Sequence, residues 1–207
     1  MKIGVMGGSF NPIHMGHLMM SEYIRSELDI DKVFFIPTGK APHKDKYVVS
    51  GEARYRMVDL ACRDNPHFHP LDIEVKNPQI SYSVDTINYL KEAYPEDDFY
   101  FFLGSDILKD LKSWKKFDQL AELTKFAVAI RPGFERITIE EVHEEISYLK
   151  ETFGAQVSLL ETPRFEISST DLRDRLAKDK SVRYLIPDPI ILYIQEKGFY
   201  KEETQNE

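Results

Sequence analysis

Residues 2–17 read KIGVMGGSFNPIHMGH, and this stretch decides the fold. Its first five residues, KIGVM, form a short apolar run that is typical of a strand buried in a sheet. Gly7 and Gly8 follow this run directly. Because glycine has no side chain, the backbone N–H groups at this turn can approach an anion closely. A strand, a glycine turn and a helix from residue 15 predict the first βα unit of an α/β fold, with an anion site at its turn.

Similar units recur along the chain. We expect strands at 2–6, 33–37, 71–75, 99–103, 125–130 and 156–160, and helices at 15–28, 51–64, 83–94, 138–153, 169–178 and 188–197. Parallel strands need long crossover connections, which helices supply. The alternation therefore predicts a doubly wound, mostly parallel sheet. We expect residues 1–200 to form one domain, with a small helical C-terminal part at about 168–200 and an acidic tail at 201–207.

The composition describes a folded, acidic protein. The 207 residues hold 27 Lys and Arg against 35 Asp and Glu, a net charge of −8, and 42% are hydrophobic. That much apolar material can bury a core, which excludes disorder, and phosphate contacts need clustered cations, which argues against a nucleic-acid partner. The single cysteine, Cys62, excludes an intramolecular disulfide and is interpreted as a small buried side chain. No apolar run reaches the roughly 20 residues of a membrane span, and we expect neither a signal peptide nor a membrane partner but a cytoplasmic protein.

Glycines and polar side chains follow most of the predicted strands. In open α/β sheets, ligands bind beyond the carboxyl ends of the strands, above all where the winding reverses. The segments to inspect are therefore the strand ends at 7–12, 38–40, 104–106, 131–133 and 167–170.

The first of these ends carries His14 and His17, three residues apart at the start of a predicted helix. This spacing places both imidazoles on one face of the first turn, beside the positive end of the helix dipole. Two ring N–H donors there can hold a phosphate oxygen. A zinc site would need a further ligand that the neighbouring sequence does not supply, and a pair of buried structural histidines is the other alternative. We favour phosphate binding.

The segment from residue 37 to residue 56 is basic within an acidic chain. It has five cations against two acids, with His43 among them: Lys40, Lys44, Lys46, Arg54 and Arg56 against Asp45 and Glu52. Beside a histidine pair, this charge predicts a mobile basic lid over a polyphosphate. The alternative is a solvated loop with incidental lysines.

The segment ISSTDLR (167–173) has two interpretations, which are compatible. Ser168 or Ser169 is a good N-cap, and Ser168 with Asp171 has the spacing of a capping box. The same helix start also offers hydroxyls, free N–H groups and Arg173 to phosphate oxygens.

Taken together, these motifs resemble a known family. GGSFNPIHMGH (7–17) with ISSTDLR (167–173) is similar to the paired signature of the HxGH nucleotidylyltransferases. The further motifs resemble those of bacterial nicotinate-nucleotide adenylyltransferases: PTGKAPHK (37–44), SYSVDT (81–86), GSD (104–106), DLKSW (110–114) and RPG (131–133). The resemblance extends from Lys2 to about Phe199. The related phosphopantetheine adenylyltransferases typically have Asp and Thr where this chain has Asn11 and His14.

The resemblance implies a Rossmann-like fold that transfers the adenylyl group of ATP to nicotinate mononucleotide. The products would be nicotinate adenine dinucleotide and pyrophosphate in NAD biosynthesis, formed without a covalent enzyme intermediate. The implied catalytic residues are His14, His17, Lys40 and Arg173. The implied ATP-binding residues are Gly7, Gly8, Ser9, Phe10, His17, Gly104, Asp106, Arg131, Ser168, Ser169 and Arg173. The implied acceptor-binding residues are Lys40, His43, Lys44, Thr86 and Trp114. No residues are implied as metal ligands, and Mg²⁺ is expected on the phosphates of ATP.

Several alternatives stay open at this point. The acceptor could be nicotinamide mononucleotide or phosphopantetheine, the donor could be CTP, or the chain could be a nucleotide-sensing module without turnover. Trp114 could stack on the pyridine ring or anchor the core. A site for the acid should present N–H donors or a helix N-terminus near Thr86, with no opposing carboxylate. Apolar positions at Ile186, Ile190, Ile191 and Tyr193 could cover the sheet or form the face of a homodimer.

Overall fold

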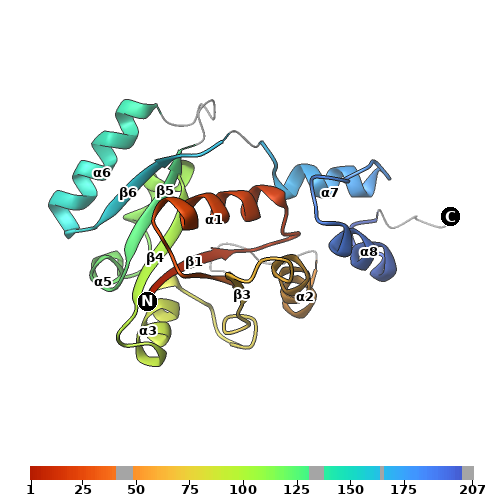
Figure 1. Cartoon of the computed structure of the whole chain (residues 1–207), viewed down its shortest axis with the longest axis horizontal. Coiled ribbons are helices and arrows are strands. Elements are labelled where there is room, and N and C mark those ends of the chain that lie inside the picture. The colour runs from red at the N-terminus through yellow and green to blue at the C-terminus, as the bar shows by residue number, and fades with distance from the viewer. Residues whose placement is uncertain (41–48, 131–137, 164–165, 202–207) are drawn as a thin grey trace.

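A computed structural model describes residues 1–40, 49–130, 138–163 and 166–201. Its centre is a six-stranded sheet in the order β3-β2-β1-β4-β5-β6, and every neighbouring pair is parallel (Figure 1). The strands are β1 (Lys2–Gly8), β2 (Lys32–Pro37), β3 (Phe68–Pro70), β4 (Asp98–Gly104), β5 (Lys125–Ile130) and β6 (Val157–Glu161). The predicted doubly wound, parallel sheet is confirmed.

Helices cover both faces of this sheet. One layer contains α1 (Met15–Glu27), α2 (Gly51–Cys62), α7 (Ser169–Ala177) and α8 (Asp188–Lys197). The opposite layer contains α3 (Ser83–Ala93), α4 (Leu108–Leu111), α5 (Phe117–Leu123) and α6 (Ile139–Phe153), with a 3₁₀ turn η1 (Ser105–Ile107) before α4. Within the described ranges, no helix has both the length and the apolar character needed to cross a bilayer.

The middles of the inner strands β1, β2, β4 and β5 are continuously apolar because this part of the sheet is buried on both faces. In β5, Phe126 and Val128 pack into the layer of α3–α6, whereas Ala127 and Ala129 face the layer of α1. Side chains of successive strand residues point to opposite faces, so each strand supplies both cores. A Cβ on Gly4 would collide with the ring of Phe102, so β1 needs glycine where this ring crosses it.

The winding of the sheet reverses at β1, which pairs with β2 on one side and β4 on the other. At such a point the connections after neighbouring strands run to opposite sides of the sheet. This leaves a crevice between them at the carboxyl ends of the strands. The residues that end β1 and β4, Gly8 and Gly104, lie at this edge. The topology therefore places the glycine turn of the first βα unit where a ligand site is expected.

The third strand is not where the sequence predicts it. Residues 71–75, LDIEV, alternate like a strand, but β3 ends at Pro70. The N–H of Leu71 still bonds to the carbonyl of Phe35 (2.9 Å), and the N–H of Lys76 then bonds back to the carbonyl of Asp72 (2.9 Å), which closes a turn. The alternation arises because the side chains of Leu71 and Ile73 pack against the core from this turn.

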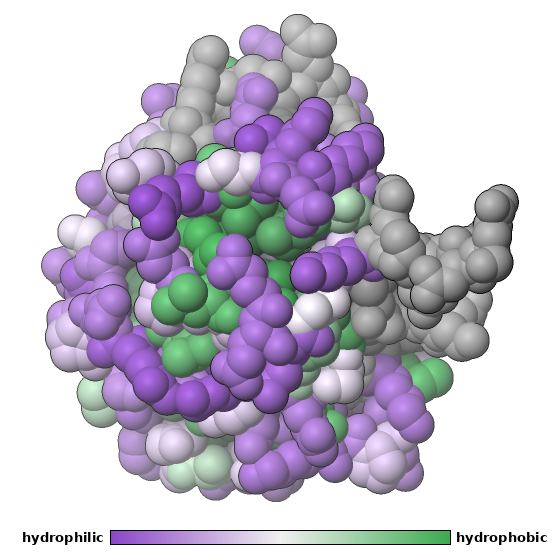
Figure 2. Space-filling view, turned by 90° about the vertical axis from the view of Figure 1, so that its right-hand side faces the viewer, coloured by the Kyte–Doolittle hydropathy of each residue, from purple (hydrophilic) through white to green (hydrophobic). Residues whose placement is uncertain are grey.

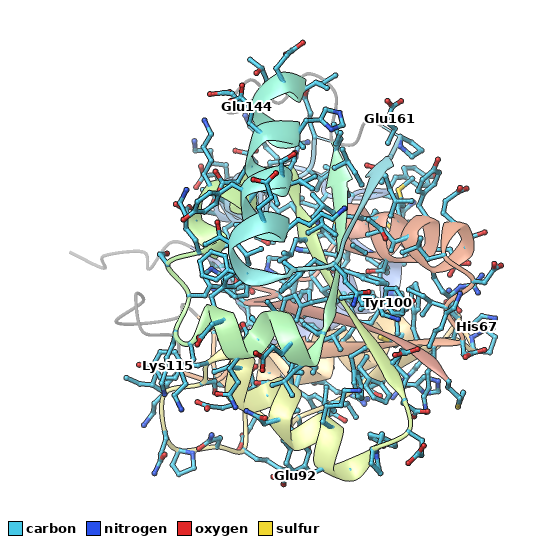
Figure 3. All side chains as sticks on the ribbon, turned by 90° about the vertical axis from the view of Figure 1, so that its left-hand side faces the viewer. His67, Glu92, Tyr100, Lys115, Glu144 and Glu161 are labelled. Carbon is cyan, nitrogen blue, oxygen red and sulfur yellow. The ribbon has the colours of Figure 1, made fainter. Side chains whose placement is uncertain are left out.

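The C-terminal helices α7 and α8 pack against the layer of α1 and α2. Ile186 and Ile190 are buried, and Ile191 and Tyr193 pack against the same core. These four positions therefore contribute to the core, while Ile191 and Tyr193 stay half-exposed, and a homodimer face stays a prediction. Figure 2 shows this side of the molecule, where hydrophobic residues gather in a central hollow ringed by hydrophilic ones. On α6, the glutamate-rich helix, Glu144 projects outward as expected of a solvated face (Figure 3).

Candidate active site

The two histidines lie together at the start of α1. His14 is the N-cap residue, with extended backbone angles, and its N–H donates to Nδ1 of His17 (3.3 Å). The two rings are stacked, with centroids 3.7 Å apart and planes at 28°. His14 is buried and His17 is half-buried. The pair therefore occupies the first turn of α1, where backbone N–H groups and the helix dipole favour an anion.

The glycine turn before the histidines is tied to its neighbours through backbone groups. The carbonyl of Gly8 accepts from the N–H of Thr38 (2.8 Å), which joins the ends of β1 and β2. The next carbonyl, that of Ser9, accepts from Nη1 of Arg54 (2.7 Å). Phe10 has a positive φ of 46°, and its ring is 1% exposed and meets the ring of His17 edge-on. The ring of Phe10 thus supports His17 from the core, and a role of residue 10 along a nucleotide stays a prediction for its backbone.

The C-terminal part of the chain is hydrogen-bonded to the loop between β1 and α1. The hydroxyl of Ser169 donates to the carbonyl of Pro12 (2.9 Å), and Nη1 of Arg173 donates to the carbonyl of Asn11 (2.9 Å). The phenol of Tyr200 donates to Oδ1 of Asn11 (2.6 Å) in a buried contact. These bonds bring ISSTDLR to the loop that carries the histidines, although the two motifs lie at opposite ends of the chain.

The predicted cap of α7 is confirmed. Ser168 is the N-cap residue, and its Oγ accepts from the N–H of Asp171 (3.1 Å) and donates to the carboxylate of the same residue (2.7 Å). Arg173 also donates to the hydroxyl of Thr170 (3.1 Å). A phosphate role for Ser168, Ser169 and Arg173 stays a prediction.

The end of β4 lies on the other side of the crevice. A Cβ on Gly104 would collide with Oδ1 of Asp106, so the carboxylate folds back over the glycine. Asp106 is exposed, in the 3₁₀ turn that follows. Two residues implied for ATP therefore sit together at the carboxyl edge of the sheet. Arg131, which follows β5, lies outside the described residues.

The basic segment is only partly what the sequence predicts. Lys40 is exposed, whereas His43, Lys44 and Lys46 lie outside the described residues. Arg54 is 1% exposed in α2 and donates to the carbonyls of Ser9 and Val49, so it belongs to the core and not to a lid. Arg56 forms an ion pair with Asp59 (2.5 Å) one turn further along the helix. A helix starting at Gly51 holds both arginines, which removes them from the predicted lid.

Thr86 is buried in the first turns of α3, and its hydroxyl donates to Oε1 of Glu74 (2.7 Å). The expectation that no carboxylate opposes Thr86 is therefore wrong. The two residues line a cavity of about 360 Å³. Burial raises the pKa of Glu74, against the opposing effects of the Thr86 hydroxyl, the Gly39 N–H and the charge of Arg54.

Trp114 is half-buried, and its ring meets the ring of Phe101 edge-on at 5.8 Å. The neighbouring Lys115, at the rim of the molecule in Figure 3, lies over the ring of Tyr82 (3.8 Å) and pairs with Asp85 (3.4 Å). The tryptophan segment and the start of α3 are thus side by side. Trp114 contributes to the core, and its partial exposure leaves ring surface for a ligand.

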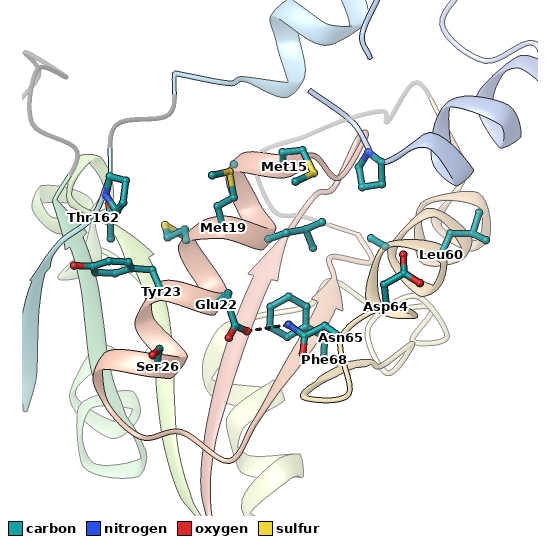
Figure 4. A pocket seen from close by; sticks show the side chains of 16 residues that line it. Met15, Met19, Glu22, Tyr23, Ser26, Leu60, Asp64, Asn65, Phe68 and Thr162 are labelled. Atoms are coloured by element: carbon teal, nitrogen blue, oxygen red, sulfur yellow. Dashed lines mark hydrogen bonds between the residues drawn. The ribbon is translucent and has the colours of Figure 1, made fainter. Parts of the chain in front are cut away.

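A larger cavity, of about 650 Å³, lies beside α1 (Figure 4). Three methionines and two leucines are among the residues that line it, and among its polar groups Nδ2 of Asn65 donates to Oε2 of Glu22 (2.8 Å). None of the predicted site residues lines this cavity, although Met15 and Gly16, between the two histidines, do.

Two other titratable groups, Cys62 and Tyr200, have raised pKa values that keep them protonated at neutral pH. Burial raises the pKa of the Cys62 thiol to about 12, which suits the predicted small core side chain and excludes a thiolate nucleophile at neutral pH. Burial also raises the pKa of Tyr200, so its phenol stays protonated and donates to Asn11.

Sequence reasoning missed two residues that organise this site, Glu74 and Tyr200, and assigned a third, the buried Arg54, to a solvent-facing lid. Glu74 occupies one of the two charged positions of the alternating segment 71–75, and this pattern does not distinguish it from a solvent-facing residue. Nothing in the sequence around Tyr200 points to a partner 189 residues away.

Comparison with known proteins agrees with this geometry. Residues 5–175 match a family model described as cytidylyltransferase-like. A probable nicotinate-nucleotide adenylyltransferase of Desulfitobacterium hafniense is 40% identical over 97% of this chain and 96% of its own, and one of Thermoanaerobacter is 38% identical over 100% and 97%. The fold is similar to that of the nicotinic acid mononucleotide adenylyltransferase of Plasmodium falciparum complexed with NaAD, with a TM-score of 0.78, 23% identity, and coverage of 96% and 97%. The chain therefore belongs to the nicotinate-nucleotide adenylyltransferases, within the cytidylyltransferase-like family.

Proposed function

We propose that this protein transfers the adenylyl group of ATP to nicotinate mononucleotide. A phosphate oxygen of the mononucleotide attacks the α-phosphorus of ATP, a new P–O bond forms, and the bond to the β-phosphate oxygen breaks. The products are nicotinate adenine dinucleotide and pyrophosphate. The observation that carries this proposal is the stacked His14–His17 pair at the start of α1, bound through its loop to Ser169 and Arg173.

The proposed catalysis is positioning and electrostatic stabilisation. The attacking phosphate is already anionic near neutral pH, so the reaction needs no general base. The imidazoles of His14 and His17 face the charge that develops on the α-phosphate and the leaving pyrophosphate. Arg173, Ser168 and Ser169 hold the triphosphate at the N-terminus of α7, and Lys40 adds charge from the end of β2.

The residues that bind the nucleotide and those that bind the acceptor are assigned to opposite sides of the crevice. We assign the nucleotide to the backbone of residues 7–10, to Gly104 with Asp106, and to Arg131. We assign the acceptor to Thr86 and Trp114, with Lys40, His43 and Lys44 near its phosphate. Residues 1–200 are proposed to act as one catalytic domain, and the free, buried thiol of Cys62 suits a reducing, cytoplasmic setting.

Magnesium is proposed to enter with ATP. Among the described residues, no group of three or more His, Cys, Asp or Glu side chains could hold a metal ion. Apart from the carboxylate of Asp106, the side-chain groups assigned to the phosphates are imidazoles, hydroxyls and a guanidinium, which suit phosphate oxygens. When bound to the β- and γ-phosphates, the ion supplies charge neutralisation of the leaving group.

The test is turnover with ATP and Mg²⁺ and each mononucleotide in a separate reaction, measured as pyrophosphate release. We expect release with nicotinate mononucleotide, at a kcat/KM well above that for nicotinamide mononucleotide. A preference for the amide would reverse the assignment of the acceptor. A parallel reaction with CTP in place of ATP tests the nucleotide, and binding of ATP without release of pyrophosphate from either reaction would favour a sensing module.

A further inference from the structure

Glu74 is a carboxylate beside the proposed acceptor site that the mechanism above does not use. It lies in the turn after β3, and its Oε1 accepts a 2.7 Å hydrogen bond from the hydroxyl of Thr86 in α3. The backbone N–H of Gly39, just after β2, favours the ionised form of this carboxylate and so lowers its pKa, against the effect of burial. One side chain thus joins three segments that are separate in the sequence.

The contact between these segments is close. A Cβ on residue 39 would collide with the backbone carbonyl of Glu74, so only glycine lets the end of β2 approach the turn. The next residue, Lys40, bridges to Ile80, and its carbonyl accepts from the N–H of Ser81 (3.0 Å). The segment Gly39–Lys40 therefore contacts the turn at Glu74 through residue 39 and the residues just before α3 through residue 40.

The direction of the Thr86 hydrogen bond limits what this residue can do for a ligand. A hydroxyl has one proton, and here its acceptors are Oε1 of Glu74 (2.7 Å) and, at a longer distance, the carbonyl of Tyr82 (3.3 Å). The hydroxyl of Thr86 can therefore accept from a ligand, but it cannot also donate to the carboxylate of a nicotinate. The contribution of Thr86 to binding must come from its place in α3, which Glu74 fixes.

We propose that Glu74 is a positioning residue for the acceptor: it holds Gly39 and Thr86 at a fixed separation and thereby sets the affinity for nicotinate mononucleotide. This inference rests on the proposed function. The ATP side is held differently, because Ser169, Arg173 and Tyr200 bond to the loop before the histidines and not to Glu74. Loss of the Glu74 contacts should therefore affect the acceptor and leave ATP binding unchanged.

The decisive variant is Glu74→Gln, which keeps the size of the side chain. A carboxylate accepts at both oxygens, whereas an amide has one accepting oxygen and one NH2 group, whose N–H donors would face either the Thr86 hydroxyl or the Gly39 N–H. Because Trp114 is the single tryptophan, its fluorescence reports acceptor binding without turnover. We expect the Kd and the KM for nicotinate mononucleotide to rise about tenfold, the effect of one lost charged hydrogen bond. The KM for ATP and kcat at saturation should stay within about twofold.

Two further variants separate positioning from general damage. Glu22→Gln is the matched control, because Glu22 is also a hydrogen-bonded, partly buried glutamate but lies on α1 beside the other cavity; it should leave both KM values unchanged. Thr86→Val breaks the same hydrogen bond from its other end and should also raise the acceptor Kd. The double variant Glu74→Gln/Thr86→Val should have an acceptor Kd no higher than that of the single variant with the higher Kd. Both changes remove the same hydrogen bond, so their effects should not add.

Three results would overturn the inference: an unchanged acceptor Kd in Glu74→Gln, an equal loss of ATP affinity, or additive effects in the double variant. If Glu74→Gln does not fold, Thr86→Val decides, and an unchanged acceptor Kd in that variant overturns the inference. A wild-type protein that releases no pyrophosphate with either mononucleotide contradicts the proposed function instead. An active wild type with an unaffected Glu74→Gln variant contradicts the inference alone.

Discussion

His17 differs from His14 in what it can offer a substrate. His14 is buried at the N-cap of α1, whereas His17 keeps part of its surface exposed and is held by the N–H of His14 and the edge of Phe10. A ring that is fixed before the substrate arrives costs no reorganisation when charge develops on a phosphate oxygen. His17 is therefore the side chain where substitution should affect the reaction most and the fold least.

We expect His17→Ala to lower kcat by about 10²–10³, because one preorganised donor aimed at developing charge is removed. The melting temperature should change little, since this ring is not part of the fully buried core. Pyrophosphate release and a thermal melt followed by circular dichroism measure the two effects. His143→Ala, on the exposed side of α6, is the control and should be fully active. Near-wild-type turnover in His17→Ala would contradict the assigned role.

Glu74 and Glu22 should respond to pH with opposite signs. Burial raises the pKa of Glu74, so the folded state holds its proton more tightly, and the contribution of this residue to stability falls as pH rises above about 4.5. The hydrogen bond from Arg25 lowers the pKa of Glu22, so its contribution is present at neutral pH and is lost as pH falls below about 4.5.

We therefore expect the free energy of unfolding of the wild type, relative to Glu74→Gln, to decrease between pH 3.5 and pH 7. Relative to Glu22→Gln, it should increase over the same range. Urea denaturation at several pH values measures both differences. Two differences that change with pH in the same direction would contradict one of the assigned pKa shifts.

At the scale of single residues, the sequence predicted the side chains whose role depends on local spacing. The i, i+3 pair of histidines and the cap at Ser168 follow from the geometry of one helix turn. Arg54 was misplaced because a cation near a basic loop looks the same in sequence whether it faces solvent or the carbonyl of Ser9. A contact across the fold leaves no trace in local spacing.

At the scale of elements, long periodic segments were predictable and short ones were not. The bounds of α1, α3, α6 and α8 follow hydrophobic stripes and caps. Helices of four and seven residues, α4 and α5, are too short to show a period. The alternation of residues 71–75 was assigned to a strand because a turn that buries every second side chain gives the same pattern.

The turn that follows α8 contacts the active-site loop through one hydrogen bond. The phenol of Tyr200 donates to Oδ1 of Asn11, and both residues are buried. We expect Tyr200→Phe to lower the free energy of unfolding by about 1–3 kcal/mol, because the amide oxygen of Asn11 is left buried without this donor. Tyr193→Phe, in the preceding helix α8, is the control and should change stability by less than about 0.5 kcal/mol. Urea denaturation of both variants checks this, and equal stabilities would show that Tyr200 does not anchor the loop.

For the whole molecule, the order of the strands determines which distant residues meet. Because the sheet reverses its winding at β1, the ends of β1 and β4 open one crevice. The chain then crosses the sheet to β6 and returns through α7 to the loop at Asn11. The site is complete only when both ends of the chain are folded together, so the unfolded chain has no binding site for either substrate.

This topology predicts strong stabilisation by ligands. A ligand that binds only the folded state, at 100 times its Kd, adds about 2.7 kcal/mol, which is about 5–10 °C in melting temperature for a chain of this length. We expect ATP with Mg²⁺ to raise the melting temperature of the wild type, and nicotinate mononucleotide to raise it separately. Glu74→Gln should keep the shift with ATP and lose about half of the shift with the mononucleotide at the same concentration, because a tenfold higher Kd leaves the ligand at about 10 times Kd. The two ligands are tested apart. If neither raises the melting temperature of the wild type, the crevice is not the binding site. If the mononucleotide raises the melting temperatures of the wild type and of Glu74→Gln equally, Glu74 does not affect acceptor binding.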